Sequence, residues 1–238
     1  DEIIEIVQDG VNDILAGTYN TGMQPKKISW TIGQPAERLC ELDGAHLCHT
    51  AIRDLLSYKP MIDFMVEVTG AKSIKLMASQ LFYKPPHGLF EDRKNFIPYH
   101  QDGLYLGDHF KEASLFSCWV PLCDMSEQNG SMTYIARSQN LGPKINNVGY
   151  MKINLDEARF KQFNCYPELV AIPKGFLSIH HGDLLHGSGA NYSNKPRAAI
   201  VLHCLMDNFE PNLTDSASLQ NPQLANIFDD PFCFPVLL

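Results

Sequence analysis

The hydrophobic periodicity of the chain changes near residue 70, and this change limits the folds that the sequence can adopt. Over residues 1–17, DEIIEIVQDGVNDILAG places apolar side chains at helical spacing, with acidic residues early and a glycine at the end. Residues 45–60 repeat this pattern up to Pro60, and MIDFMVEVTG (61–70) predicts a further short helix that ends at Gly70. The first 70 residues are therefore expected to be largely helical.

After residue 73 the sequence changes to β-type runs separated by turn residues. Strands are predicted in SIKLMASQLFYKPP (73–86), EASLFSCWVPL (112–122), GSMTYIA (130–136), GFLSIHHGDLLHGSG (175–189) and RAAIVLHCLMD (197–207). Residues 138–170 show no regular pattern and are expected to form a long excursion, of the kind that often serves as a functional lid. Helices followed by short strands predict a β-barrel or a double sheet buttressed by N-terminal helices.

The composition fits one globular domain and excludes several classes of partner. Of the 238 residues, 45% are hydrophobic and 19% charged, a balance that permits a sizeable core. The net charge of −8 argues against nucleic acid and anionic lipid, and the apolar runs are too short to cross a bilayer. Seven cysteines without a C-x-x-C pair indicate reduced thiols in a cytoplasmic protein. We expect a single domain over residues 1–238, with a helical buttress over about 1–70, a β core over about 73–208 and a C-terminal tail.

The stretch YHQDGLYL (99–106) contains a candidate metal site. On an extended strand, residues i and i+2 share a face, so His100 and Asp102 would offer one imidazole and one carboxylate to the same ion. A third ligand must come from elsewhere in the chain, and His186 has the most suggestive setting, at a glycine-rich turn. Two histidines and one carboxylate leave coordination positions open, as in non-haem Fe(II) oxygenases.

Arg197 opens the apolar run RAAIVLHC, 11 residues after His186. A buried guanidinium needs an anionic partner, because an unpaired charge in the interior is very costly. No carboxylate lies at a strand-paired spacing, so a bound acid ligand is a candidate partner. Each feature alone has a simpler interpretation: a chance H-x-D triplet, a hydrogen-bonded histidine, or a strand-start arginine at the surface. Their occurrence together favours the metal site.

These residues and the segments around them resemble the phytanoyl-CoA dioxygenase family, a branch of the Fe(II)/2-oxoglutarate oxygenases. The likeness covers roughly residues 74–208 and is carried by LFYKPP, YHQDG, CWVPLCDMSEQNGSMTYIARSQN and HGDLLHGSGANYSNKPRAAI. The family pattern is an H-x-D motif, a distal histidine and an arginine eleven residues beyond it. The chain departs from the pattern at ARSQN (136–140), where family members usually have PGSH.

The resemblance implies a double-stranded β-helix, a cupin-like jelly-roll barrel, with iron in its mouth. It implies that His100, Asp102 and His186 ligate Fe(II) and that Arg197 binds the distal carboxylate of 2-oxoglutarate. Further contacts to this co-substrate are implied for Gln80, Trp119 and Ser188. Because related halogenases replace the carboxylate ligand with a small residue, the presence of Asp102 favours hydroxylation.

The expected activity is hydroxylation of a small organic substrate, lipid-like or a natural-product intermediate, while 2-oxoglutarate and O₂ are converted to succinate and CO₂. Tyr99 and Tyr105, on either side of the H-x-D motif, are candidate substrate contacts. The sequence leaves open a cupin-like metal-dependent isomerase or hydrolase without O₂, and a non-catalytic 2-oxoglutarate- or metal-binding module. It does not distinguish hydroxylation from desaturation or cyclisation, and it gives neither the substrate nor the oligomeric state.

Overall fold

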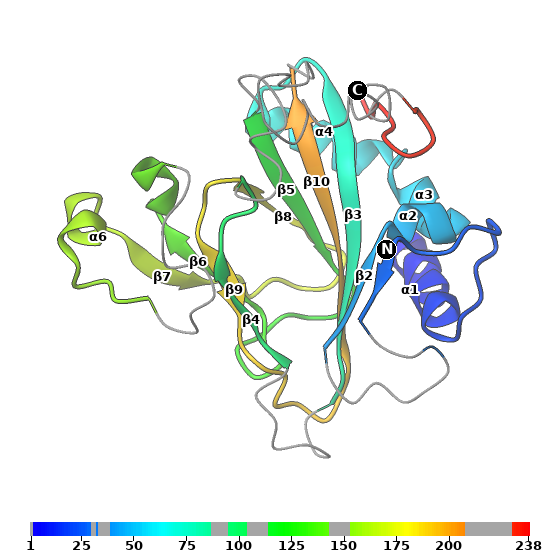
Figure 1. Cartoon of the computed structure of the whole chain (residues 1–238), viewed down its shortest axis with the longest axis horizontal. Coiled ribbons are helices and arrows are strands. Elements are labelled where there is room, and N and C mark those ends of the chain that lie inside the picture. The colour runs from blue at the N-terminus through cyan, green and yellow to red at the C-terminus, as the bar shows by residue number, and fades with distance from the viewer. Residues whose placement is uncertain are drawn as a thin grey trace, which may run out of the picture.

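Two antiparallel sheets enclose the interior in the computed structural model, which describes residues 2–29, 32, 39–86, 95–103, 114–142, 153–207 and 230–238. The large sheet contains, in spatial order, β1 (Lys27–Ile28), β2 (Cys40–Asp43), β3 (Ile74–Lys84), β10 (Arg197–Met206), β5 (Ser114–Pro121) and β8 (Ser178–His181). The small sheet contains β4 (Ile97–His100), β9 (His186–Ser188), β6 (Met132–Ala136) and β7 (Tyr166–Leu169). The two sheets lie side by side in Figure 1, and the predicted double sheet is confirmed.

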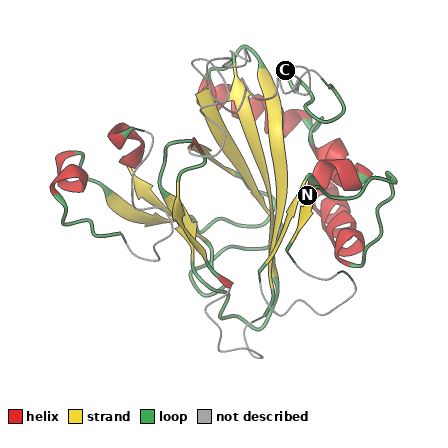
Figure 2. Cartoon of the chain, viewed as in Figure 1, coloured by secondary structure: helices red, strands yellow, loops and turns green. Residues whose placement is uncertain are grey.

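Four helices cover the side of the large sheet that faces away from the small one (Figures 1 and 2). They are α1 (Glu2–Leu15), α2 (Ala45–Cys48), α3 (Thr50–Leu55) and α4 (Lys59–Thr69). Their apolar stripes and the outward side chains of the sheet form one buried cluster, which includes Val7, Ile52, Leu81 and Leu202. Burial of this apolar surface is the main force that holds the helices on the sheet. Among the described residues, no helix has the length and apolarity needed to cross a bilayer.

The helix boundaries over residues 45–70 lie at or next to His49, Pro60 and Gly70. Residues 45–60 do not form one helix that ends at Pro60, because His49 is extended (φ −143°, ψ 133°) and its side chain caps α3 by accepting the N–H of Ala51. Pro60 instead lies in the first turn of α4, where its missing N–H costs nothing. Gly70 ends α4 as predicted, with a left-handed φ of 71° that glycine adopts without strain.

Part of the predicted excursion over 138–170 has regular structure. It contains a 3₁₀-helix (Ser138–Leu141), α6 (Ala158–Gln162) and β7, which pairs with β6 and extends the small sheet. The prediction of irregular structure was therefore wrong for these segments. All four residues of β7 are exposed, so YPEL lacks the apolar alternation that would identify a strand from the sequence. Residues 143–152 of the excursion lie outside the described part of the chain.

The C-terminal segment returns to the large sheet beside β3. The N–H of Leu76 donates to the carbonyl of Pro235 (2.9 Å), and the N–H of Leu237 donates to the carbonyl of Ile74 (2.8 Å). His46 of α2 reaches the same segment, because its Nε2 lies 3.0 Å from the carbonyl oxygen of Cys233. A carbonyl only accepts, so Nε2 carries the ring proton and Nδ1 accepts from Ser79 Oγ at 2.6 Å.

This buried histidine predicts a pH dependence of stability. Burial lowers the pKa of His46 from 6.5 to about 4, so the unfolded chain binds a proton there at mildly acidic pH and the folded chain does not. Stability is therefore lost as the pH falls from 6.5 towards 4, and we expect His46 to account for about 2 kcal/mol of the loss between about pH 7 and pH 5. When stability is measured by urea denaturation at these two pH values, the loss of stability in His46→Gln should be smaller than the wild-type loss by this amount. The same loss in both proteins would contradict the prediction.

Candidate metal centre

His100, Asp102 and His186 converge between the two sheets. One donor atom from each lies within 4.8 Å of the other two. The arrangement does not arise as the i, i+2 spacing suggested, because β4 ends at His100 and Asp102 lies in the turn beyond it. It arises from strand pairing: His100 and His186 are register partners on β4 and β9, and their ring centroids are 4.2 Å apart.

A β-bulge in β4 aims His100 into the interior. Ile97 pairs with Ser188 and His100 with His186, so the segment of β4 between the two pairs is one residue longer than that of β9. This extra residue allows Ile97 and His100 to line the same cavity despite their odd spacing. This cavity, which the metal cluster shares with Trp119 and Arg197, is called the inner cavity. Proline is tolerated at such irregularities, and Pro98 lies within this one.

Hydrogen bonds to the backbone fix which ring nitrogens face the shared point. His100 Nδ1 lies 2.8 Å from the carbonyl of Pro98, and His186 Nδ1 lies 3.0 Å from the carbonyl of Leu184. Because carbonyls only accept, both Nδ1 atoms carry protons and both Nε2 atoms present lone pairs. These Nε2 atoms lie 3.5 Å and 3.6 Å from Asp102 Oδ1. Burial also lowers the pKa of His186 well below its ordinary value, which keeps the ring neutral.

The second oxygen of Asp102 is held by residues that the sequence did not identify. Ser117 Oγ donates to Oδ2 at 2.6 Å, and His180 Nε2 lies 3.2 Å from the same atom. Burial opposes ionisation of this carboxyl, but the surrounding histidines and the hydrogen bonds to the carboxylate outweigh it, so the pKa of Asp102 lies well below its usual range. The carboxylate is therefore ionised and oriented, with Oδ1 directed towards the two imidazoles.

His180 is buried and connects Asp102 to Tyr134. Its Nε2 donates to the carboxylate, so Nδ1 accepts the hydroxyl of Tyr134 at 3.1 Å, and that hydroxyl also bonds Ser178 Oγ. Partners of this kind orient metal ligands and are commonly worth a tenfold to hundredfold change in metal affinity. The pairing of β8 with β5, which places His180 opposite Ser117, could not be inferred from the sequence.

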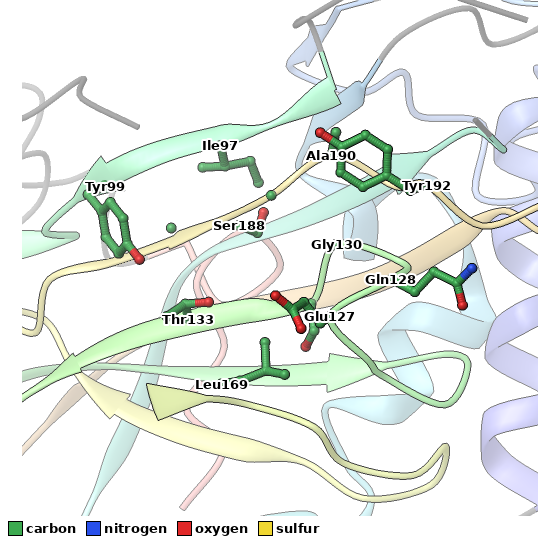
Figure 3. A pocket seen from close by; sticks show the side chains of 13 residues that line it. Ile97, Tyr99, Glu127, Gln128, Gly130, Thr133, Leu169, Ser188, Ala190 and Tyr192 are labelled. Atoms are coloured by element: carbon green, nitrogen blue, oxygen red, sulfur yellow. The ribbon is translucent and has the colours of Figure 1, made fainter. Parts of the chain in front are cut away.

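Removal of the Tyr134 hydroxyl should therefore weaken metal binding. In Tyr134→Phe, His180 Nδ1 loses its donor and the ring no longer has a fixed orientation, so we expect affinity for Co(II) to fall by about tenfold or more. A spectroscopic Co(II) titration measures this. Tyr99→Phe is the matched control, because Tyr99 lies in the same small sheet but lines a groove on its other side (Figure 3). Equal affinities in wild type and Tyr134→Phe would contradict the proposed link.

Arg197 lies beside a second buried cation, Lys84, which is its register partner on β3. The Lys84 ammonium donates to Ser188 Oγ (2.6 Å) and to the carbonyls of Gly130 and Gly189. Arg197 donates from one terminal nitrogen to the Gly130 carbonyl, while its Nε has no hydrogen-bond partner in the part of the chain that the structure describes. Burial, followed by repulsion from Arg197, lowers the pKa of Lys84 well below its ordinary value. Among the described residues, no carboxylate pairs with either cation.

The other predicted site residues divide into two groups. Gln80, Trp119 and Ser188 line the inner cavity together with the metal cluster and Arg197, and the Trp119 ring lies 5.3 Å from the guanidinium. Tyr99 does not join them, because it faces the groove on the other side of the small sheet, close to Thr133 in Figure 3. Tyr105 lies outside the described residues. Lys84, which lies near the end of the predicted strand over 73–86, was not identified from the sequence as a site residue.

The donor set of the cluster fits a divalent transition metal. Two neutral imidazoles and one carboxylate on one side of an ion leave the remaining positions for a co-substrate and O₂, an arrangement typical of non-haem Fe(II) centres. The orientation of all three donors by hydrogen bonds to their other atoms meets a further requirement of such sites.

Comparison with known proteins agrees with this chemistry. Residues 36–199 match the family model described as phytanoyl-CoA dioxygenase. A curated relative from Stutzerimonas stutzeri, a probable alpha-ketoglutarate-dependent hypophosphite dioxygenase, is 27% identical over 217 residues, which cover 85% of this chain and 70% of that protein. Alpha-ketoglutarate is another name for 2-oxoglutarate.

Solved structures share the fold. The alpha-ketoglutarate-dependent carbocyclase SnoK from nogalamycin biosynthesis has a TM-score of 0.65 at 18% identity, covering 92% of this chain and 82% of its own. The epimerase SnoN, solved with Fe³⁺ and alpha-ketoglutarate, has a TM-score of 0.62 at 18% identity, covering 86% and 74%. The predicted jelly-roll fold is thereby confirmed, and the predicted cofactors, iron and 2-oxoglutarate, agree with these relatives.

Proposed function

This chain belongs to the phytanoyl-CoA dioxygenase family, and on that premise we propose that it is an Fe(II)/2-oxoglutarate-dependent dioxygenase that hydroxylates a small organic substrate. One observation carries the proposal: a His-Asp-His cluster and a buried arginine without an acidic partner among the described residues line the same inner cavity. An ion at one end and a dicarboxylate that reaches the other end would satisfy both groups.

The metal would be held by His100 Nε2, His186 Nε2 and Asp102 Oδ1. The two Nδ1–H groups anchor the rings to the backbone, and Ser117 and His180 anchor the carboxylate, so no ligand needs to reorient when the ion binds. When bound, iron together with 2-oxoglutarate and O₂ supplies the oxidising chemistry, in which one oxygen atom enters the substrate and the other enters succinate as CO₂ is released.

Arg197 and Lys84 would bind the distal carboxylate of 2-oxoglutarate. A carboxylate accepts from both cations, and it relieves the repulsion between them together with part of the cost of their burial. Ser188 accepts from Lys84, so its own O–H can donate towards the cavity that it lines. Trp119 covers the guanidinium, and Met132 and Val201 pack around it in one buried apolar cluster. This apolar surround excludes water and strengthens the ionic contacts.

The paired cations weigh against the two alternatives that the sequence leaves open. A cupin-like isomerase or hydrolase that works without O₂ has no use for two buried cations beside its metal. A binding module without catalysis would not need metal ligands that also line a large second cavity, as His100 and Asp102 do. We therefore favour the dioxygenase.

Production of succinate tests this function directly. With Fe(II), ascorbate and 2-oxoglutarate under air, the protein should form succinate slowly even without its substrate, and omission of Fe(II) should stop this turnover. Calorimetry with Mn(II) in place of iron should show saturable binding of 2-oxoglutarate. Absence of both succinate and 2-oxoglutarate binding would exclude the proposed activity.

A further inference from the structure

A second cavity opens on the side of the metal cluster away from the two cations. It has a volume of about 850 Å³ and shares His100, Asp102, Gln80 and His203 with the inner cavity. This space can accept a drug-sized molecule directly beside the metal ligands. Under the proposed function, it is where the substrate binds. We call it the substrate cavity.

The walls of the substrate cavity differ in polarity. Phe82, Phe96, Ile97 and Pro98 give it an apolar side next to the metal cluster. The other side is formed by β2, whose residues alternate: Leu42 packs into the core beneath the helices, while Glu41 and Asp43 face the cavity. The pairing of Glu41 with Phe82 and of Asp43 with Gln80 places both carboxylates beside the apolar side chains.

A chain of hydrogen bonds fixes the acidic wall relative to the metal cluster. Gln80 Nε2 donates to Asp43 Oδ1 (2.8 Å), and Gln80 Oε1 lies 3.0 Å from His203 Nε2. His203 Nδ1 lies 2.8 Å from Ser117 Oγ, which bonds Asp102. One continuous network along the inner face of the large sheet therefore connects Asp43 to the metal ligand Asp102.

The positively charged and the negatively charged groups lie in different parts of the interior. The two buried cations, Lys84 and Arg197, lie where 2-oxoglutarate is proposed to bind. Lys84 donates to Gly130, Ser188 and Gly189, and Arg197 donates to Gly130. Apart from the metal ligand, the described residues that line the substrate cavity contribute the carboxylates of Glu41 and Asp43 and one ammonium group, that of Lys26, which lies 4.9 Å from the centre of the Phe234 ring. An anionic substrate would meet repulsion there, whereas a cationic group would be attracted.

We propose that the substrate is an amphipathic molecule with an amine or comparable cationic group, which Glu41 binds while the apolar part packs against Phe82 and Phe96 near the metal. The cavity indicates that a ligand binds here, and the carboxylates in the cavity wall indicate that this ligand carries a positive charge. The inference rests on the proposed function. It distinguishes this chain from an enzyme for anionic acyl-CoA thioesters, and from its bacterial relative described as a probable hypophosphite dioxygenase, since hypophosphite is an anion.

Three probes with one skeleton test the proposal. A phenylbutyl chain that ends in an ammonium, a hydroxyl or a carboxylate is titrated by calorimetry into the Mn(II)–2-oxoglutarate complex, so that turnover does not interfere. We expect the amine to bind about tenfold more tightly than the alcohol, and the carboxylate to bind most weakly. In Glu41→Gln, which preserves size and hydrogen bonding, the amine should lose most of this advantage and the alcohol should be unaffected.

Glu127→Gln is the matched control, because Glu127 is a carboxylate in the groove on the other side of the small sheet (Figure 3). Added salt gives a test that needs no variant. Salt should weaken the binding of the amine probe and leave the binding of the alcohol probe unchanged. A carboxylate probe that binds as tightly as the amine, or an amine advantage that survives Glu41→Gln, would overturn the inference. Binding of 2-oxoglutarate is measured first, so failure of the proposed function is recognised separately.

Discussion

Replacement of Asp102 by alanine should abolish succinate formation and lower metal affinity by more than about a hundredfold. This loss exceeds that expected from removing an outer hydrogen-bond partner, because Asp102 supplies the only anionic donor of the described cluster. Without Oδ1, the two imidazoles are left without the charge that balances a divalent ion. Co(II) titration and succinate analysis measure the two effects separately.

The controls distinguish loss of the ligand from loss of the fold. Asp102→Ala also removes the acceptor of Ser117 and His180, which should cost about 1–3 kcal/mol of stability. Asp102→Asn keeps an acceptor at the same place but removes the charge, so it should fold better and still fail to form succinate. Asp63→Ala changes an exposed carboxylate and should behave as wild type. Wild-type turnover in Asp102→Asn would show that the cluster is not the centre.

Replacement of Lys84 by methionine should preserve or raise the stability of the ligand-free protein, but it should weaken the binding of 2-oxoglutarate. Without an anion, Lys84 and Arg197 repel each other in a buried site, so an apolar side chain of similar length should leave stability unchanged or raise it. With 2-oxoglutarate, loss of one buried cation should cost about 2–5 kcal/mol, a weakening of about thirtyfold or more. Arg197→Met should follow the same pattern.

Thermal unfolding with and without 2-oxoglutarate measures both effects in one experiment, because a ligand that binds only the folded state stabilises it by RT ln(1 + [L]/Kd). Lys59→Met removes an exposed ammonium that pairs with Asp63, and it should leave the 2-oxoglutarate effect unchanged. If Lys84→Met lowers the stability of the ligand-free protein and leaves binding intact, Lys84 has a structural role and does not bind the co-substrate.

The sequence indicated the metal ligands for a reason that the structure only partly supports. The H-x-D triplet, His186 and Arg197 were recognised by type and order along the chain, and the fold brings them to one cavity. The expected extended strand through Asp102 is absent, and a bulge with a turn replaces it. Side-chain types were therefore more informative than the local geometry assumed for them.

The residues that the sequence did not reveal depend on strand register. Lys84 becomes a partner of Arg197 only because β3 and β10 pair at that offset, and His180 reaches Asp102 only because β8 pairs with β5. Neither offset leaves a mark on hydrophobic periodicity. Strand β7 was missed for another reason: both of its faces are exposed, so no apolar alternation develops.

The bulge in β4 makes strand alignment a condition for metal chemistry. If β9 slipped by one residue against β4, His186 would turn away from the interior and the cluster would lose a ligand. Gly187 helps to maintain the alignment, because a Cβ atom there would lie only 2.9 Å from the carbonyl oxygen of Ile97. A side chain at this position would force the two strands apart without touching any ligand atom. The ability to hold iron is thus encoded in backbone spacing as well as in ligand identity, and a substitution at residue 187 can inactivate the protein while all three ligands remain.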